Sequence, residues 1–407
     1  IKKDLVVKSI EDYARSVLYC ASSSATACDD AEIIESYGNI YRSLSVCQDT
    51  LRPDLTDHML RLCREDDNLF SQTASKIHLT DAQNIIFDNR KWILNEFDKI
   101  IFLARLNAET LWPENTNVSS FPHWTNNTKA LADSSALYAD LIDFHRSNGF
   151  GLLSQHHFFT WSNARLRPVL HPDNILPDQL FEYVYERSII NKNTEKLFSR
   201  QFAENILLFG ARGTGKSSTV KAVANANRDR GLRLIEVDKE NILCLSELLT
   251  YLSELRHTCL SFIIFLDDIV LEEQDAKFRM LKKVLEGGVS VKPDNTVIYA
   301  TSNRRHIVAE KLDNDLYEND AREEKLSLSD RFGLSVRFAS PNNAIYLSIV
   351  HALLQYYGVE YNRVSIEHEA LEWSMRHNGR SPRTARQFVD TFRCKNIIKN
   401  KDGHTNV

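Results

Sequence analysis

The feature that most constrains the fold is a glycine-rich segment between a strand-like run and a helix-like run. Residues 210–217 read Gly-Ala-Arg-Gly-Thr-Gly-Lys-Ser, the pattern of a Walker A phosphate loop. Residues 205–209 are mainly apolar and have the length of a buried strand, and residues 218–224 have the composition of a helix. Glycines let a backbone wrap around a phosphate, and the N–H groups of a helix N-terminus hold its charge. The segment therefore predicts an α/β fold that binds a nucleoside triphosphate.

Two side chains of this segment carry specific expectations. Lys216 is expected to reach the β- and γ-phosphates, and the Ser217 hydroxyl is expected to ligate Mg²⁺. The predicted nucleotide-binding residues are Gly210, Ala211, Arg212, Gly213, Thr214, Gly215, Lys216, Ser217 and Ser218.

Composition narrows the class of protein. A chain of 407 residues is expected to form two or three domains. A net charge of −5 gives no overall attraction to nucleic acid or to anionic membranes. It does not exclude a local basic patch. The seven cysteines include no CxxC pair, so their spacing predicts neither a metal site nor a disulfide framework. Reduced thiols fit a cytoplasmic protein.

No apolar run approaches the roughly 20 residues that a membrane span needs. No signal-peptide pattern opens the chain, although it begins at Ile1 rather than Met. We therefore expect a cytoplasmic location and no membrane span.

The pattern of apolar residues divides the chain near residue 160. Upstream, Val6, Ile10, Tyr13 and Val17 recur at helical spacing. From residue 205, strand-like runs alternate with helical ones at 206–209, 232–237, 262–266, 297–300 and 334–338. This alternation predicts a parallel sheet that binds ligands at the carboxyl ends of its strands. The expected domains are a helical N-terminal region (1–160), a nucleotide-binding core (161–339) and a helical lid (340–407), with Ser340 capping the lid's first helix.

Two acids follow the third of these runs, as in a Walker B motif. Asp267 is expected to hold Mg²⁺, and Asp268 to act as the base that polarises the attacking water. The alternative is that both acids cap the helix that follows.

Three further side chains lie where a nucleotide site would need them. Asn303 ends the fourth run and can orient water or the γ-phosphate, or simply form a turn. Arg331 precedes the fifth run and is predicted to reach the γ-phosphate of a neighbouring subunit; a surface ion pair is the alternative. Arg383 follows Ser381, the expected cap of a lid helix, and is predicted to face the nucleotide. Competing residues are Arg304 and Arg305 for the neighbouring subunit's site, and Arg386 for the lid.

Together these motifs resemble the AAA+ ATPases, whose Walker A, Walker B, sensor 1, arginine finger and sensor 2 occur here in order. The resemblance narrows to the bacterial family catalogued as domain of unknown function 815 and covers residues 168–393. The segments that carry it are 205–218, 232–239, 285–288, 299–306, 324–333 and 381–389. It implies ATP binding with Mg²⁺ and ATP hydrolysis, with residues 171–185 flanking the adenine.

Three departures from the pattern refine this expectation. Residues 238–241 lack the aromatic pore loop of a threading unfoldase, and the acidic stretch 313–324 looks like a solvated insertion. Most AAA+ relatives carry Glu where Asp268 stands, so hydrolysis is expected to be slow.

The sequence thus predicts an Mg-dependent ATPase that forms a homo-oligomer and remodels an unknown protein client. One alternative is a nucleotide-gated binding module with negligible turnover. Another is a nucleic-acid loader or initiator-like ATPase, which the acidic composition disfavours.

Overall fold

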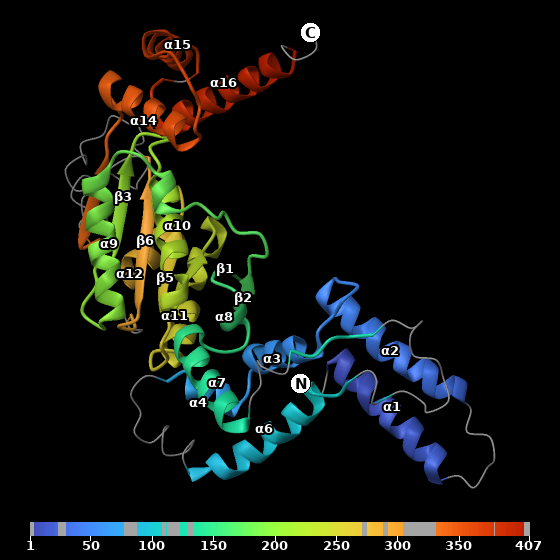
Figure 1. The fold of residues 1–407 in the computed structure, drawn as a ribbon. Coiled ribbons are helices and arrows are strands. Elements are labelled where there is room, and N and C mark those ends of the chain that lie inside the picture. The colour runs from blue at the N-terminus through green and yellow to red at the C-terminus, as the bar shows by residue number, and fades with distance from the viewer. Residues whose placement is uncertain are drawn as a thin grey trace. The chain divides into compact units, whose positions relative to one another are not determined.

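The structure is a computed structural model. It describes residues 4–22, 30–76, 88–107, 111, 123–127, 133–270, 275–287, 292–303, 331–377 and 379–402. The chain divides into two compact units, shown in Figure 1. The first unit comprises Ile1–Gln155 with His257–Cys259, and the second comprises His156–Arg256 with Leu260–Val407.

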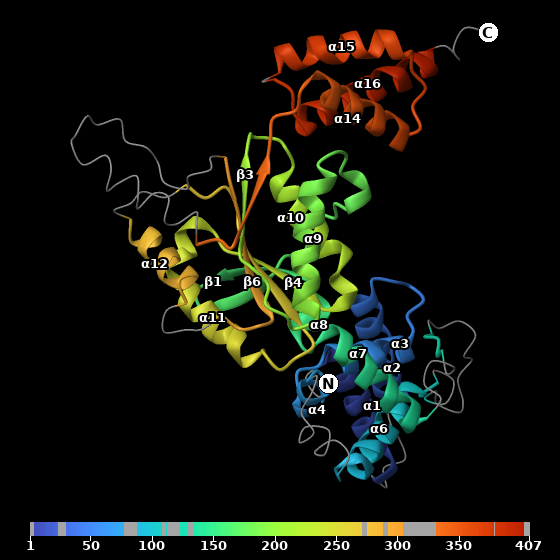
Figure 2. The ribbon, with the colours of Figure 1, turned by 90° about the vertical axis from the view of Figure 1, so that its left-hand side faces the viewer.

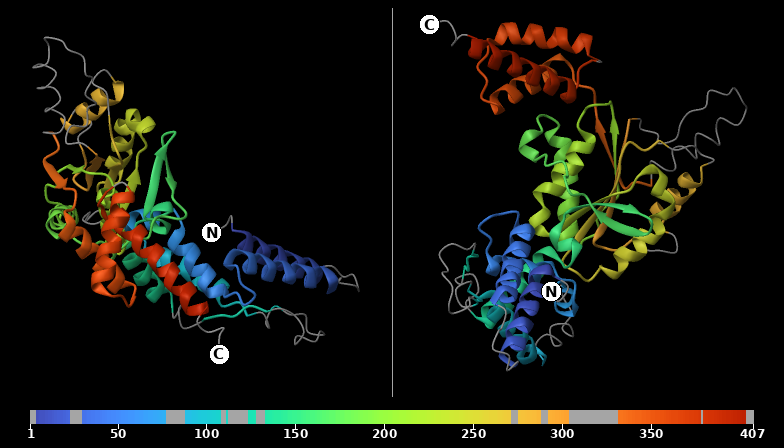
Figure 3. Two further views of the ribbon diagram at one scale, coloured as in Figure 1. Left: turned by 90° about the horizontal axis from the view of Figure 1, so that it is seen from above. Right: turned by 90° about the vertical axis from the view of Figure 1, so that its right-hand side faces the viewer.

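The first unit is helical, as predicted. Its helices are α1 (Leu5–Ser22), α2 (Asp30–Gln48), α3 (Leu55–Glu65), α4 (Leu69–Ala74), α6 (Arg90–Ala104), α7 (Ser134–Asn148) and α8 (Leu152–Gln155). Helices α1 and α2 lie side by side (Figure 3). Val6, Ile10 and Tyr13 are buried in the apolar core, whereas Val17 is 37% exposed. Only the first part of the predicted apolar face of α1 is therefore covered.

The second unit contains a sheet whose order, among the described residues, is β2-β1-β4-β5-β6-β3-β7. Its strands are β1 (Phe158–Ser162), β2 (Arg165–Pro168), β3 (Ile206–Gly210), β4 (Leu232–Glu236), β5 (Ser261–Leu266), β6 (Thr296–Ser302) and β7 (Leu334–Phe338). All neighbouring pairs are parallel except β1 and β2. The five predicted strands are confirmed. The sequence missed the β1–β2 hairpin, because it expected the sheet to begin near residue 205.

Helices cover both faces of this sheet (Figure 2). Helices α9 (Val184–Phe198) and α10 (Lys216–Ala226) lie on one face, and α11 (Leu245–Glu254) and α12 (Ala276–Leu285) on the other. Short turns complete the unit at η4 (Pro177–Gln179), η5 (Arg228–Arg230) and η6 (Lys239–Cys244). Every residue of β5 and β6 is buried. The central strands therefore read as continuous apolar runs, as expected for a parallel sheet covered on both faces.

The chain ends in a helical lid of α14 (Asn343–Tyr356), α15 (Arg363–Arg376) and α16 (Pro382–Asp402). Ser381 caps α16, as predicted, because its Oγ accepts the Thr384 N–H at 3.1 Å. The first lid helix begins later than predicted: Asn342, not Ser340, is its cap and accepts from the Ile345 N–H. Within the described part of the chain, no helix has the length and apolarity to cross a membrane.

Candidate nucleotide-binding site

The phosphate loop joins the end of β3 to the start of α10, and its glycines are needed for steric reasons. Gly210 has φ 136°, and a Cβ there would lie 2.0 Å from the Phe338 carbonyl oxygen in β7. Gly213 has φ 75°, and a Cβ there would lie 2.9 Å from Ser381 Oγ in the lid. Side chains at either position would push the loop away from its neighbours.

Lys216, the first residue of α10, is buried beneath this loop. Its Nζ donates to the carbonyl oxygens of Gly210 (2.9 Å) and Ala211 (2.8 Å) and lies 3.3 Å from Asn303 Oδ1. Burial lowers the pKa of Lys216, and the carboxylates of Asp268 and Asp267 oppose that shift. The ammonium is thus held at the junction of β3 and β6.

Asp267 follows β5 and meets hydroxyl groups from two other elements. Ser217 Oγ in α10 donates to Asp267 Oδ1 at 2.6 Å, and Thr301 Oγ1 in β6 donates to the same oxygen at 2.5 Å. Asp275 caps α12 by accepting from the Lys277 N–H. The two acids therefore do not cap α12, which removes the structural alternative weighed from the sequence.

Asp268 has left-handed backbone geometry, with φ 48°, and is held at two points. Its N–H donates to Thr301 Oγ1 at 2.8 Å, and its Oδ1 accepts from Asn303 Nδ2 at 2.5 Å. The sequence pointed to Asn303 but gave Thr301 no role. The only available signal was that Thr301 is a polar residue near the carboxyl end of a buried strand.

A cavity of about 630 Å³ opens above these groups and gathers most of the predicted residues. The predicted residues that line it are Arg212, Gly213, Thr214, Gly215, Lys216, Ser217, Ser218, Asp267, Asp268, Asn303 and Arg383. Gly210 and Ala211 contribute the carbonyl groups that hold Lys216.

Arg331 forms an ion pair with Glu286 and does not line this cavity. The competing residues Arg304 and Arg305, and the acidic stretch 313–324, lie outside the described residues.

The lid and the segment before α9 form the remaining walls. The Arg383 N–H donates to the Gly213 carbonyl oxygen at 3.2 Å, which places the start of α16 against the phosphate loop. Arg386 in α16 donates to the Gln179 carbonyl oxygen at 3.1 Å. Ile175, Gln179 and several other side chains of residues 171–185 line the cavity, as do apolar residues of α14.

The cavity is rich in positive charge. Arg187 in α9 lines the cavity, and the sequence analysis missed it because it belongs to no recognisable motif. Burial lowers the pKa of Arg187, and the carboxylates of Glu186 and Glu182 oppose this shift. The charged side chains that line the cavity are Arg187, Arg212, Lys216, Arg383 and Arg386, with Asp267 and Asp268. The excess of cations favours a polyanionic ligand.

The phosphate loop after β3, the acids after β5, the polar end of β6 and a helical lid define a P-loop fold of the AAA+ class. The family described as protein of unknown function, DUF815, matches residues 154–396, which is more than half of the chain. The chain therefore belongs to this family, and the resemblance seen in the sequence is confirmed.

The solved structures that match this chain are distant. A RuvB variant from Thermotoga maritima is 16% identical with a TM-score of 0.39, and the alignment covers 55% of this chain and 66% of that one. A structure titled as the Thermotoga maritima RuvB Holliday junction branch migration motor is 11% identical with a TM-score of 0.32, covering 53% and 72%. A DNA replication initiation factor is 17% identical with a TM-score of 0.36, covering 57% and 69%. Comparison with curated proteins gives no match.

Proposed function

We propose that this chain binds ATP with Mg²⁺ in the cavity and hydrolyses it to ADP and phosphate, to drive remodelling of a partner. One observation carries the proposal. The phosphate loop, two carboxylates, a polar strand end and a lid arginine, from distant parts of the sequence, all line one cavity of about 630 Å³. That volume is in the range of cavities that enclose small-molecule ligands.

The residues present fit a magnesium ion. Ser217 Oγ and Asp267 Oδ1 lie 2.6 Å apart at the floor of the cavity, and both are the hard oxygen donors that Mg²⁺ takes. These two residues would hold the ion, which would supply positive charge beside the phosphates.

The other side chains of the site have separate roles in phosphate binding and in water activation. Lys216 and Arg383 balance the phosphate charge, and Asn303 orients the attacking water. Asp268 accepts the proton of that water as the general base. Arg331, which does not line its own cavity, acts at the site of a neighbouring subunit, so the active form is a homo-oligomer.

A nucleotide-gated binding module with negligible turnover is the second candidate. It is favoured by the hydrogen bond of 2.5 Å that holds the Asp268 carboxylate on Asn303. A carboxylate held there, on a side chain one methylene shorter than Glu, is poorly placed to accept a proton from an attacking water molecule.

Measurements of ATP binding and phosphate release test the proposal. Asp268→Asn should keep ATP affinity and lower the rate of phosphate release about 10²–10⁴-fold, the usual contribution of a general base. Lys216→Ala should weaken ATP binding, whereas Lys221→Ala, which alters a lysine of α10 outside the cavity lining, should not. An Asp268→Asn protein that hydrolyses ATP at the original rate would refute the assigned base. ATP binding without phosphate release in the unaltered protein would establish the second candidate.

A further inference from the structure

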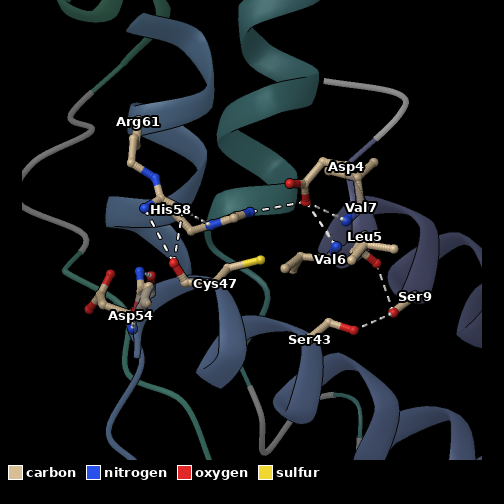
Figure 4. Close-up of polar contacts among 11 residues, drawn as sticks. Asp4, Leu5, Val6, Val7, Ser9, Ser43, Cys47, Asp54, His58 and Arg61 are labelled. Carbon is tan, nitrogen blue, oxygen red and sulfur yellow. Dashed lines mark hydrogen bonds and ion pairs between the residues drawn. The ribbon is translucent and has the colours of Figure 1, made fainter. Parts of the chain in front are cut away.

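A second cluster of ligand-type side chains lies in the first unit. Figure 4 shows Asp4 at the start of α1, Cys47 near the end of α2 and His58 in the first half of α3. One carboxylate oxygen, the thiol sulfur and one imidazole nitrogen all lie within 4.8 Å of one another. His58 is only 1% exposed. The same three helices also contribute fully buried residues to the core of this unit, namely Val6, Leu44 and Met59.

We propose that Asp4, Cys47 and His58 bind a zinc ion. Thiolate sulfur, imidazole nitrogen and carboxylate oxygen are the three ligand types that Zn²⁺ takes in proteins. Zinc bonds of about 2.0–2.3 Å bring such atoms within roughly 4 Å of each other, so side-chain adjustments are enough to close the site. Three protein ligands leave the fourth tetrahedral position to water.

The contacts around Asp4 support a metal ligand. Its Oδ1 accepts from the Val6 N–H at 2.8 Å and from the Val7 N–H at 3.2 Å. Hydrogen bonds of this kind orient a ligating carboxylate from the second coordination shell. The same oxygen lies 3.0 Å from His58 Nε2, where the metal ion would replace the shared proton.

The proton balance of binding follows from these contacts. Cys47 binds as thiolate and releases its thiol proton to solvent. The acceptor Asp4 Oδ1 faces Nε2 and the Arg61 donor faces Nδ1, so these contacts place the His58 ring proton on Nε2. That proton moves to Nδ1 when Nε2 binds the metal, and the ring releases no net proton.

Arg61 is the group that opposes the ion. One guanidinium nitrogen of Arg61, a hydrogen-bond donor, lies 3.2 Å from His58 Nδ1. When the metal binds Nε2, Nδ1 must itself carry a proton, so two donors would then face each other. The arginine is exposed, and it also donates to the Cys47 carbonyl oxygen at 3.3 and 3.4 Å, so it can leave Nδ1 without losing all its partners. Arg61 therefore acts on zinc binding in two ways: it faces the nitrogen that must become a donor, and its positive charge partly opposes the rise that burial causes in the pKa of the Cys47 thiol.

Cobalt and zinc titrations of the reduced, metal-free, 407-residue chain test the proposal. Co²⁺ should give a sulfur-to-metal charge-transfer band that Zn²⁺ removes. Cys47→Ser should abolish the band, while Cys394→Ser, which alters an exposed cysteine of α16, should keep it. Asp4→Asn preserves an acceptor for the start of α1, and His58→Gln preserves a polar side chain. Each should weaken zinc binding by more than the roughly 10–100-fold typical of losing an outer-shell partner.

Arg61→Gln separates a metal site from an ordinary ion pair. The glutamine oxygen can accept from Nδ1–H. We expect this gain to exceed the loss of a positive charge that favours the Cys47 thiolate, so zinc should bind several-fold more tightly. If Asp4 and His58 merely form a structural pair, Arg61→Gln gives no increase in affinity. Absence of the cobalt band in the unaltered chain, or its persistence in folded Cys47→Ser protein, overturns the proposal.

Discussion

Thr301 shows how one hydroxyl group can position two acids. It donates to Asp267 Oδ1 at 2.5 Å and accepts from the Asp268 N–H at 2.8 Å. The second contact holds Asp268 in its left-handed backbone conformation, which costs energy for a residue other than glycine. A hydroxyl with one donor and two lone pairs satisfies both contacts at once. Asp267 and Asp268 therefore depend on β6 as much as on β5.

Lys292, in another part of the second unit, carries an ammonium group that is largely buried at an energetic cost. Its Nζ donates to the Ala203 carbonyl oxygen at 3.0 Å and to Asn205 Oδ1 at 3.1 Å, just before β3. Burial lowers the pKa of Lys292 to about 8, and the Glu204 carboxylate only partly opposes this. Two neutral acceptors do not replace the hydration of an ammonium group.

We predict that Lys292 makes stability rise with pH above about 8. Between that pH and about 10.4, the usual pKa of lysine, the unfolded chain binds more protons than the folded chain, so the free energy of unfolding increases with pH. The increase is of the order of 3 kcal/mol. Urea unfolding at pH 8 and pH 10 should show most of this increase in the unaltered chain and none of it in Lys292→Met. Lys283→Met, at an exposed position of α12, should retain it. Parallel pH curves for the unaltered chain and Lys292→Met would contradict the prediction.

Among the elements, the strands that carry the site were predictable because they are buried. Buried parallel strands consist of apolar runs, and the observed limits of β3 to β7 depart from the predicted runs by two residues at most. The β1–β2 hairpin gave no such signal. Its turn residues Asn163 and Ala164 both have positive φ without a glycine, and β2 carries two exposed arginines. Backbone pairing, rather than apolar content, defines that strand.

The same reasoning explains which site residues the sequence could indicate. Asp267, Asp268 and Asn303 follow neighbouring parallel strands, whose carboxyl ends meet at one edge of the sheet. Arg187 comes from the first turn of a helix that precedes all the motifs, and its approach to the cavity depends on how α9 packs. Tertiary packing of that kind has no local sequence pattern.

The wall formed by residues 171–183 yields a prediction at the scale of elements. Asn225 in α10 donates through Nδ2 to the carbonyl oxygens of Asp173 and Ile175, both at 2.8 Å. Asn225→Ala leaves two carbonyl groups without this donor and should cost about 1–3 kcal/mol of unfolding free energy. Because Ile175 lines the cavity, ATP affinity should fall about tenfold, for a loss near 1.4 kcal/mol.

Calorimetric titration with ATP and urea unfolding measure the two effects of Asn225→Ala. Asn227→Ala is the matched control, since its Nδ2 donates to Val223 within the same helix region and not to the wall. Equal ATP affinities for the two variants would show that the wall segment does not need this anchor.

At the scale of the whole molecule, Arg331 is the residue that we propose to act between one chain and another. Within its own chain it pairs with Glu286 at the end of α12, and its side chain is 29% exposed. A partly exposed ion pair contributes little to stability, so losing the contact with Glu286 costs little. The γ-phosphate of a nucleotide bound to a second copy offers a stronger partner, with more charge and more acceptor oxygens than one carboxylate.

We therefore predict that the ATPase rate per subunit rises with protein concentration and that Arg331→Ala abolishes the rise. Loss of a finger arginine lowers turnover by about 10³–10⁵-fold while leaving ATP bound within each chain. Glu286→Gln is the decisive comparison, because it breaks the same ion pair and keeps the arginine. If Arg331 acts on a second copy, Glu286→Gln keeps the concentration dependence; if the ion pair only stabilises the fold, both variants lose activity together. A different result would be a low rate that does not change with protein concentration in the unaltered protein and in both variants, with ATP still bound. That result would fit a nucleotide-gated module, and the next step would be to find the partner that recognises its ATP-bound form.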